Sequence, residues 1–180
     1  MENIIIKELA LEEFENFMNY LTIHLSENGK DNHFFQPVSK DQLNLDAEWQ
    51  EKFKAGLTKT WGETIWRKLW LAKNRENQIV GHVDIRSRNE PNTLHRVLLG
   101  MGVHSDFRKM KIGNQLLAYA IKYCINHSEI VWLDLEVMTN NTPAVNLYAK
   151  NDFHIVANYA DMFRIEGKFF DYTAMTLRVG

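Results

Sequence analysis

A basic turn with a single glycine is the part of the sequence best suited to binding an anion. It runs from Arg108 to Gly113, RKMKIG, between an apolar run, LLGMGV, and a helix-like run that starts at about Ile112. Helix N-termini leave backbone N–H groups free and carry the positive end of the helix dipole, which suits a phosphate. Lys109 and Lys111 add positive charge, and the glycine allows close approach or an unusual dihedral. A diphosphate site and an ordinary solvated turn both fit these residues.

The turn matches neither of the common phosphate-binding loops. A Walker loop ends in Gly-Lys-Ser/Thr, which this segment lacks, and the dinucleotide fingerprint needs three spaced glycines. Gly100 and Gly102 alternate in the preceding strand, where glycine predicts a bulge or a close approach by another backbone or a ligand. The expected ligand is therefore a different phosphorylated molecule.

An α/β fold with a mixed sheet must position this turn. Apolar and β-branched runs predict strands at 4–9, 66–73, 79–86, 95–104, 130–137, 153–165 and 169–178. Helical spacing of apolar residues predicts helices at 11–25, 41–59, 112–124 and 143–150, with a polar loop over 26–40. The turn NRENQ predicts a hairpin, and Glu166-Gly167-Lys168 joins a closing antiparallel pair. Only the strand–helix–strand unit around the basic turn has to be a parallel crossover.

The bulk composition is typical of a globular protein with one domain. The 180 residues are 45% hydrophobic and 24% charged. The 21 basic and 23 acidic residues give a net charge of -2, which argues against a dedicated nucleic-acid binder. A single cysteine excludes an intramolecular disulfide and fits a cytoplasmic location. The sequence has no signal-peptide pattern at its start, and no run approaches the roughly 18 apolar residues of a membrane span.

A second motif, after the next strand, makes the pattern specific. VWLDLEV is followed by NNTPAVNLYAKNDF, residues 140–153. The two motifs together resemble the GNAT superfamily of acetyl-CoA-dependent N-acetyltransferases, whose pattern is a valine-ended strand, R/Q-x-x-G-x-G/A, a further strand and N-x-x-A-x-x-L-Y-x-K-x-G-F. The matching residues are Val103, Arg108, Gly113, Asn141, Ala144, Leu147, Tyr148, Lys150 and Phe153.

The resemblance implies a GNAT fold, with a mostly antiparallel twisted sheet of about seven strands and flanking helices. It implies one domain over 1–180, in which 66–180 is the acetyl-CoA-binding core and 1–65 is a variable acceptor-side region. Two positions depart from the pattern: Lys111 replaces the first motif glycine, and Asp152 replaces the glycine before Phe153. The first departure concerns the shape of the phosphate turn, and the second concerns only a helix cap.

The same resemblance implies how acetyl-CoA would bind. Backbone amides of 103–114 would cradle the CoA diphosphate, and the strand before them would pair with the pantetheine arm. A backbone N–H of that strand would face the thioester carbonyl, in an oxyanion-hole role. The residues implied in binding are Met101, Gly102, Val103, Arg108, Lys109, Met110, Lys111, Ile112, Gly113, Asn114, Asn141 and Tyr148.

The implied reaction is attack of an amine on a thioester, which needs a base for the amine and an acid for the departing thiolate. Tyr148 matches the family's acid position, and a phenol with a pKa of about 10 suits that role. Many relatives carry Glu or His on the strand before the phosphate turn, where this sequence has Val97 and Leu99. Glu136 matches the base position of the branch that acetylates protein N-termini. Asp84 and His95 are weaker candidates.

Other reactive or aromatic residues are expected to be structural. Cys124 lies on the apolar stripe of a helix and is assigned to the core. The seven histidines lack metal-ligand spacing, so no metal site is expected. Trp49, Trp61, Trp66 and Trp70 are expected in the aromatic core, with one or two able to line an acceptor wall. Arg164 and Asp171 flank the last turn and form a candidate acceptor edge or dimer contact.

Three interpretations remain open from the sequence. The first is an active acetyltransferase, the second a catalytically silent acyl-CoA-binding module of the same fold, and the third an unrelated α/β phosphate-ligand protein. The acceptor, a small-molecule amine or a peptide amine, cannot be read from the residues. No nucleic acid or membrane partner is expected, and a homodimer is common in the family.

Overall fold

A computed structural model describes residues 4–30 and 34–180 of the chain. Part of the predicted loop, 31–33, lies outside the described residues. The strands are β1 (Ile5–Glu8), β2 (Arg67–Lys73), β3 (Ile79–Ser87), β4 (Arg96–Val103), β5 (Trp132–Met138), β6 (His154–Ile165) and β7 (Lys168–Arg178). The helices are α1 (Phe14–Ser26), α2 (Ala47–Leu57), α3 (Ile112–Ile125) and α4 (Thr142–Ala149), with short 3₁₀ helices η1 (Leu11–Glu13), η2 (Lys40–Gln42) and η3 (Ser105–Phe107).

The seven strands form one sheet in the order β1-β2-β3-β4-β5-β7-β6. Every neighbouring pair is antiparallel except β4 and β5, which are parallel. The parallel pair is the crossover that the sequence predicts, and α3 makes the connection. The predicted fold class is therefore confirmed.

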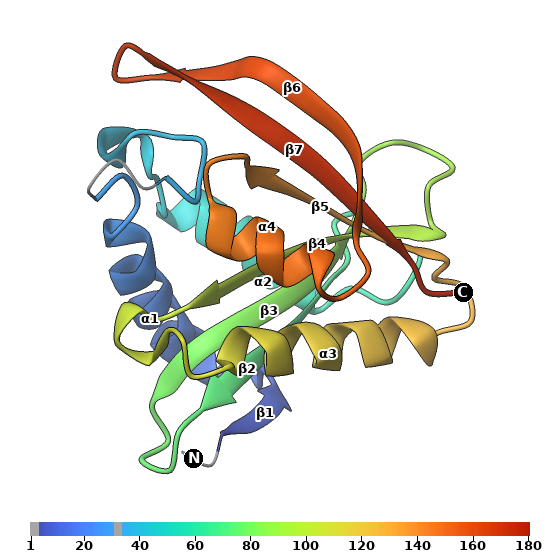
Figure 1. Ribbon diagram of the computed structural model, residues 1–180. Helices are drawn as coiled ribbons and strands as arrows, with labels where there is room; N and C mark the ends of the chain where they lie inside the picture. The colour runs from blue at the N-terminus through green and yellow to red at the C-terminus, as the bar shows by residue number, and fades with distance from the viewer. Residues whose placement is uncertain (1–3, 31–33) are drawn as a thin grey trace.

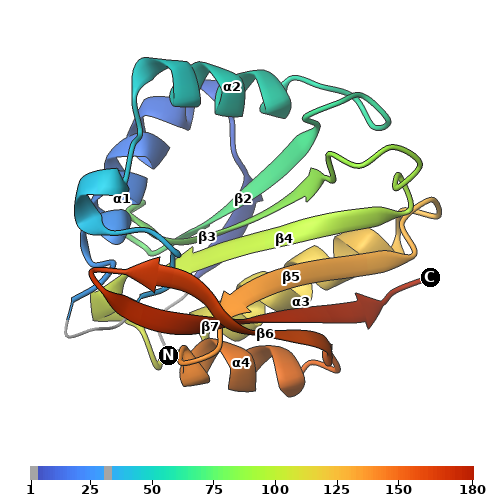
Figure 2. The same ribbon diagram turned by 90° about the horizontal axis from the view of Figure 1, so that it is seen from above.

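Two helical layers cover the sheet, α1 and α2 on one face and α3 and α4 on the other (Figures 1 and 2). The larger core lies under α3, where Leu116 and Leu117 are fully buried with residues of β3, β4 and β5. A second core lies under α1 and α2, where Phe17 packs with Phe53 and Leu71. The alternation of strand side chains thus fixes two faces, and this division decides which residues can reach the site.

The second helix is shorter than the predicted 41–59. It begins at Ala47 because the carboxylate of Asp46 accepts a hydrogen bond from the Trp49 N–H at 2.8 Å and so caps the first turn. The Asn44 side chain contacts both the backbone and the carboxylate of Asp46, which holds the preceding residues out of the helix.

Gly100 and Gly102 do not form the bulge that was one of the two expectations from the sequence. The β3–β4 register runs without a shift from Gly81–Val103 to Ser87–Val97. Side chains approach both glycines instead, and a Cβ on Gly102 would lie 2.5 Å from His24 Nε2. The missing Cβ therefore makes room for neighbouring side chains, not for an extra residue.

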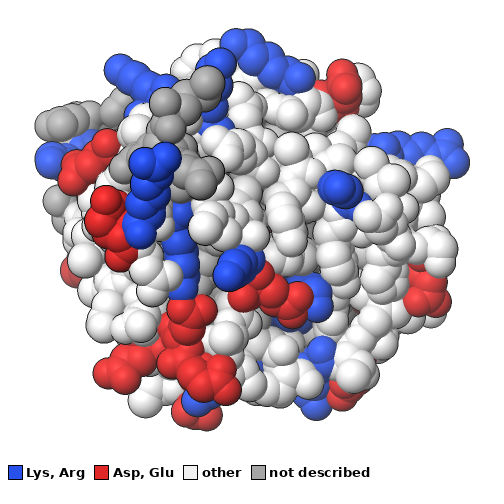
Figure 3. All heavy atoms as spheres, turned by 90° about the horizontal axis from the view of Figure 1, so that it is seen from below, with Lys and Arg blue, Asp and Glu red and all other residues white. Residues whose placement is uncertain are grey.

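The expected core residues are buried or packed against a core. Cys124, Trp66 and Trp70 lie in the larger core, with Trp61 packed against it, and Trp49 packs against the second core. None of the described helices has the length and hydropathy to cross a membrane. Basic and acidic side chains are interspersed, with wide uncharged areas between them, on the face drawn in Figure 3.

Candidate active site

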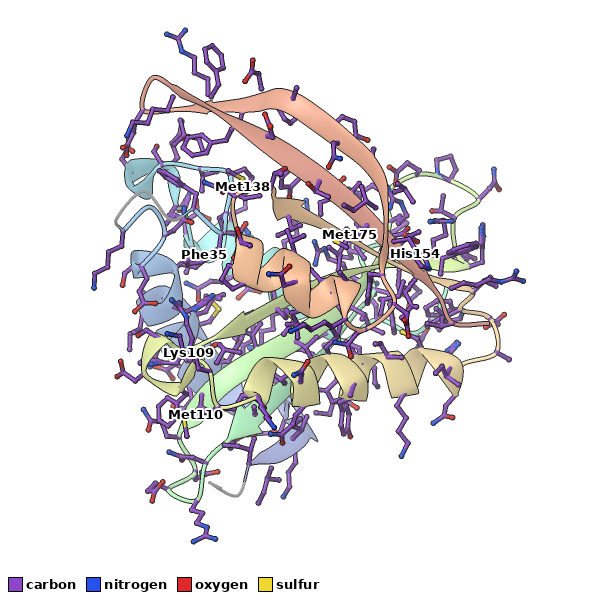
Figure 4. All side chains as sticks on the ribbon, viewed as in Figure 1. Phe35, Lys109, Met110, Met138, His154 and Met175 are labelled. Carbon is purple, nitrogen blue, oxygen red and sulfur yellow. The ribbon has the colours of Figure 1, made fainter. Side chains whose placement is uncertain are left out.

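The two parallel strands separate partway along their length. β4 pairs with β5 only over 96–98 and 132–134, after which β4 continues to Val103 along β3 and β5 continues to Met138 along β7. Residues 99–103 and 135–138 line this separation, which we call the β4–β5 splay. In Figure 1 the two arrows run together at one end and diverge towards their tips, and Met138 marks the far end of β5 in Figure 4.

Backbone groups of β4 face the splay. The His104 N–H donates to the Val80 carbonyl at 3.0 Å, and N–H groups of 131 and 132 donate to the His95 carbonyl. Because backbone groups alternate sides along a strand, the amides of Leu99, Met101 and Val103 point towards β5. The Leu99 amide belongs to the last β4–β5 register pair, Leu98–Asp134, whereas the amides of Met101 and Val103 lie beyond it and have no register partner in β5. The amide of Gly102 points towards β3, so among the predicted binding residues Met101 and Val103 present the free edge.

The basic turn connects this edge to α3. Lys109 and Lys111 have φ values of 63° and 64°, and Lys111 is the N-cap of α3 in the left-handed region. The Gln115 N–H bonds to the Lys111 carbonyl, and no backbone acceptor among the described residues engages the N–H groups of 109–114. Figure 4 labels Lys109 and Met110 in this turn. The segment therefore presents a run of donors and a helix N-terminus, as an anion site requires.

Arg108 is engaged elsewhere. Its Nη2 lies 2.7 Å from Glu27 Oε2, just after α1, and its Nε donates to the Val103 carbonyl at 3.3 Å. The guanidinium therefore braces the turn against α1. Glu27 had no signal in the sequence that linked it to the turn, because the two segments are 81 positions apart.

The remaining predicted binding residues connect α3 with α4. Gly113 keeps the helices close, because a Cβ there would lie 3.3 Å from Leu147 Cδ2. Ile112 is buried in the larger core. Asn114 Oδ1 accepts a hydrogen bond from Asn151 at 3.3 Å, and Asn141 is the N-cap of α4. Of the two explanations offered for Gly113, the structure supports close approach.

Tyr148 is held at the C-terminal end of α4 by a helix cap. The Phe153 N–H donates to the Tyr148 carbonyl, and the Asp152 N–H donates to the Ala149 carbonyl. Asp152 has a φ of 64°, so it takes the left-handed position that glycine usually occupies in this motif. The rings of Tyr148 and Phe153 are 5.7 Å apart. The departure from the family pattern at 152 therefore leaves the cap intact.

Burial shifts the pKa of the Tyr148 phenol. The residue is 7% exposed, and its burial raises the pKa of the phenol well above its ordinary value, with a further contribution from Tyr172. The hydroxyl has no hydrogen-bond partner within 4–30 and 34–180. A phenol in this environment keeps its proton at neutral pH and has it free to donate.

Glu136 and Tyr172 lie on the same side of the splay. Glu136 pairs with Ala174 and Met138 with Tyr172 across the β5–β7 ladder. Glu136 is exposed although its neighbours in β5 are buried. Burial raises the pKa of Tyr172 to about 12, with the Glu136 charge adding to this rise and the Arg86 charge opposing it. Tyr172 therefore interacts electrostatically with Glu136 from β5, Arg86 from β3 and Tyr148 from α4.

The other candidate bases are placed less favourably. Asp84 is buried, and its carboxylate accepts hydrogen bonds from Arg67 Nη1 at 2.6 Å and Arg86 Nη1 at 3.1 Å. His95 is exposed and precedes β4. At about 3.3 Å per residue it lies about 16 Å along the strand from Gly100. Arg86 and Tyr172 were not singled out from the sequence, although Asp84 and Arg86 alternate with apolar residues and so share a face.

Histidines beneath β4 are structural. Tyr20 donates to the Gly102 carbonyl at 3.3 Å and contacts His82 Nδ1 at 3.1 Å. Burial is the main cause that lowers the pKa of His82 to about 4 and that of His24 to about 3. No group of histidine, cysteine or acidic residues in the described part of the chain could hold a metal ion.

Two cavities lie outside the splay. One of about 270 Å³ is lined by residues of α1 and the β2–β3 turn, among them Tyr20 and His104. The other, of about 250 Å³, is lined by Trp61, Trp66 and the 87–96 segment. Neither is lined by Tyr148 or Glu136. We place the site at the splay because the backbone donors and the ionisable groups converge there.

Comparisons with known proteins identify the family of the chain. Over 80 residues, 44% of the chain, the sequence is 28% identical to the L-amino acid N-acetyltransferase AaaT of Escherichia coli (strain K12). The match spans about half of that protein, 49% of its length. A GNAT-family acetyltransferase from Streptococcus pneumoniae shares the fold with a TM-score of 0.83 at 22% identity, over 99% of this chain and 100% of that one.

The yncA protein of Salmonella typhimurium, whose structure contains its cofactor acetyl-CoA, has a TM-score of 0.77 at 13% identity. It is matched over 99% of this chain and 95% of that one. The sequence model of the Acetyltransferase (GNAT) family matches residues 12–153, which include β4, the basic turn and α4. The chain therefore belongs to the GNAT acetyltransferase family.

Proposed function

We propose that the protein transfers an acetyl group from acetyl-CoA to a primary amine. The observation that carries this proposal is the row of unpaired β4 amides at the splay, which leads directly into the free N–H groups of 109–114. A thioester arm laid along β4 would complete the hydrogen bonds of that edge, and a diphosphate would meet the turn. The division into a core, 66–180, and an acceptor-side region, 1–65, is part of the proposal.

In this proposal acetyl-CoA supplies an activated acetyl group as a thioester. The amides of Met101 and Val103 bind and orient the arm, and an N–H on this edge stabilises the negative charge that develops on the carbonyl oxygen. Lys109, Met110 and Lys111 contribute their backbone N–H groups to the diphosphate, and Arg108 holds their conformation through Glu27 and the Val103 carbonyl.

Tyr148 is the proposed general acid and Glu136 the proposed base. Glu136 accepts a proton from the ammonium group, directly or through a water, and the free amine nitrogen bonds to the carbonyl carbon. The carbon–sulfur bond breaks, and the Tyr148 hydroxyl donates its proton to the departing thiolate. The excess proton on the new amide nitrogen then leaves to the Tyr148 phenolate, directly or through water, which restores the phenol. The phenol is protonated at neutral pH and can therefore donate, although its raised pKa makes it a weaker acid than a free phenol and does not itself favour the transfer.

One acceptor class follows from the curated relative, which by its name acts on L-amino acids. Amino acids are therefore the first acceptors to test, with peptide amines and polyamines beside them. We also propose a cytoplasmic location, supported by the single cysteine, Cys124, which is buried and free.

The test is release of free thiol from acetyl-CoA with a panel of amines, followed by mass detection of the acetylated product. Tyr148→Phe should lower kcat by about 10²- to 10⁴-fold with little change in the Kd for CoA. Tyr159→Phe is the matched control, because Tyr159 is exposed on β6. Stabilisation by acetyl-CoA without turnover of any amine would instead identify a silent acyl-CoA-binding module.

A further inference from the structure

Two arginines share a single buried carboxylate on the acceptor side of the sheet. Asp84 lies between Arg67 and Arg86, with Nη1–Oδ2 distances of 2.6 Å and 3.1 Å. One carboxylate therefore faces two guanidinium groups. The arrangement leaves a net charge of one beside a buried acid.

The two arginines play different parts. Arg67 makes the shorter contact, has a side chain that is 19% exposed, and lies over the Phe53 ring at 4.1 Å. It is the structural partner of Asp84. Arg86 has a side chain that is 34% exposed and uses Nη1 alone in the contacts within the described residues. Arg86 therefore carries the surplus charge, with Nε and Nη2 available to a ligand.

The Arg86 side chain extends over Gly100, one of the β4 residues that line the splay. A Cβ on Gly100 would meet Asp84 Oδ1 at 2.7 Å and Arg86 Nη1 at 3.0 Å. Leu98 pairs with Asp134 in the last β4–β5 register pair, so Gly100 and Glu136 are the next positions on that face, one on each side of the splay. The guanidinium and the Glu136 carboxylate thus flank the same opening, and both affect the Tyr172 phenol.

We propose that Arg86 binds a carboxylate of the acceptor, so that the substrate is an amino acid. This inference rests on the proposed function. A zwitterion matches the site, because its ammonium group faces Glu136 and its carboxylate faces Arg86, which can form a two-point contact with it. A polyamine would place a second cation near Arg86 and be repelled. A peptide N-terminus offers no carboxylate beside its amine.

The wild-type protein provides a test that needs no substitution. Thiol release is measured with each L-amino acid and with its carboxamide, which keeps the amine and removes the negative charge. We expect kcat/KM for the best amino acid to exceed that for its amide by about 10- to 100-fold. Equal values, or a preference for spermidine, would overturn carboxylate recognition while leaving the transferase function in place.

Substitutions at Arg86 then test whether this residue recognises the carboxylate. Arg86→Gln should raise KM for the amino acid by about 10- to 100-fold and leave KM for the carboxamide unchanged. The variant would then no longer discriminate between the two substrates. Arg86→Lys should restore part of the discrimination. Arg88→Gln is the matched control, because Arg88 lies two residues away, is 24% exposed and bonds a buried aspartate, Asp134. The Arg88→Gln variant should discriminate between the amino acid and its carboxamide as the wild type does.

Two further outcomes are decisive. If Arg86→Gln reduces kcat/KM equally for the acid and the amide, Arg86 is a structural residue and the proposal is wrong. The Kd for CoA and the urea midpoint of each variant separate this result from unfolding. If the wild type acetylates no amine in the panel, the proposed function fails, and the acceptor assignment fails with it.

Discussion

Arg108 Nη2 lies 2.7 Å from Glu27 Oε2, so an ion pair ties the turn before α3 to the end of α1. The family's motif places a basic or amide residue at this position of the phosphate turn. Here its guanidinium is shared between a carboxylate and the Val103 carbonyl. The backbone donors of the turn are thus positioned by a contact between distant segments.

Replacing the Glu27 carboxylate with an amide should release the Arg108 guanidinium from this ion pair. In Glu27→Gln we expect CoA to bind about two- to fivefold more weakly, because the contact that positions the backbone donors of the turn is lost. The free energy of unfolding should change by less than about 1 kcal/mol, since the pair is partly exposed. Calorimetric titration at 0.05 and 0.5 M salt measures the effect. Tighter binding in the variant would mean that Glu27 competes with the phosphate for Arg108 and that the ion pair does not position the turn. Glu63→Gln, in the exposed Lys59–Glu63 pair, is the control.

Lys111→Gly should stabilise the protein. Lys111 has a φ of 64°, a conformation that costs a residue with a side chain about 1–2 kcal/mol. We expect a gain of about 1 kcal/mol in urea unfolding and an equal or lower Kd for CoA if backbone donors dominate. A higher Kd would show that the lysine charge supplies a contact. Lys122→Gly, in the right-handed last turn of the same helix, should have the opposite effect on stability.

Gly102→Ala should be destabilising although alanine is small. Its Cβ would lie 2.5 Å from His24 Nε2 and 2.7 Å from His82 Cε1, within packed rings. We expect a loss of about 1–3 kcal/mol in the free energy of unfolding. A double-mutant cycle with His24→Ala checks the cause, because the alanine at 102 should cost less once the His24 ring is gone. Additive effects of the two changes would locate the strain elsewhere.

Stability should fall as the pH drops below neutral. Burial lowers the pKa of His24 to about 3 and that of His82 to about 4, from an ordinary value of 6.5. Between those values the unfolded chain binds more protons than the folded one, so each histidine contributes a slope of up to about 1.4 kcal/mol per pH unit. Arg108 and His104 around His24 act in the same direction, whereas Asp84 opposes the shift of His82.

The variant His24→Phe isolates one part of this slope. Phenylalanine keeps the ring contacts with Tyr20 and Phe35 and removes an imidazole Nδ1 that has no hydrogen-bond partner. Urea unfolding at pH 7.5, 6.0 and 5.0 should show a shallower decline than in the wild type. His154→Gln, at an exposed position in β6, should leave the slope unchanged. An unaltered slope in His24→Phe would contradict the assignment.

Local sequence predicted the elements well wherever periodicity was strong. The stripe that includes Leu116 and Leu117 indicated α3, and both residues are fully buried. Prediction was wrong where a side chain competed with the helix, as Asp46 and Asn44 do before α2. The bulge considered for Gly100 and Gly102 is not formed, and the side chains that fill their space come from α1 and β3.

The site was predictable where the motif is local and not where tertiary register sets it. The backbone donors of the turn follow from the strand–turn–helix pattern, and Lys111 retains the left-handed conformation despite its side chain. Arg86 and Tyr172 reach the splay only through the pairing of β3 with β4 and of β5 with β7. The spacing of Arg86 and Tyr172 in the sequence does not predict that both reach the splay.

The β4–β5 splay also divides the sheet into two halves that share few backbone pairs. Three register pairs join β4 to β5, whereas seven join β5 to β7 and seven join β3 to β4. We therefore expect the half formed by β5, β6 and β7 to open as a unit, with amides that exchange hydrogen faster than those of β3. A ligand arm laid along β4 would act as an added strand and join the two halves. Binding of the ligand should therefore make the unfolding of the two halves more cooperative.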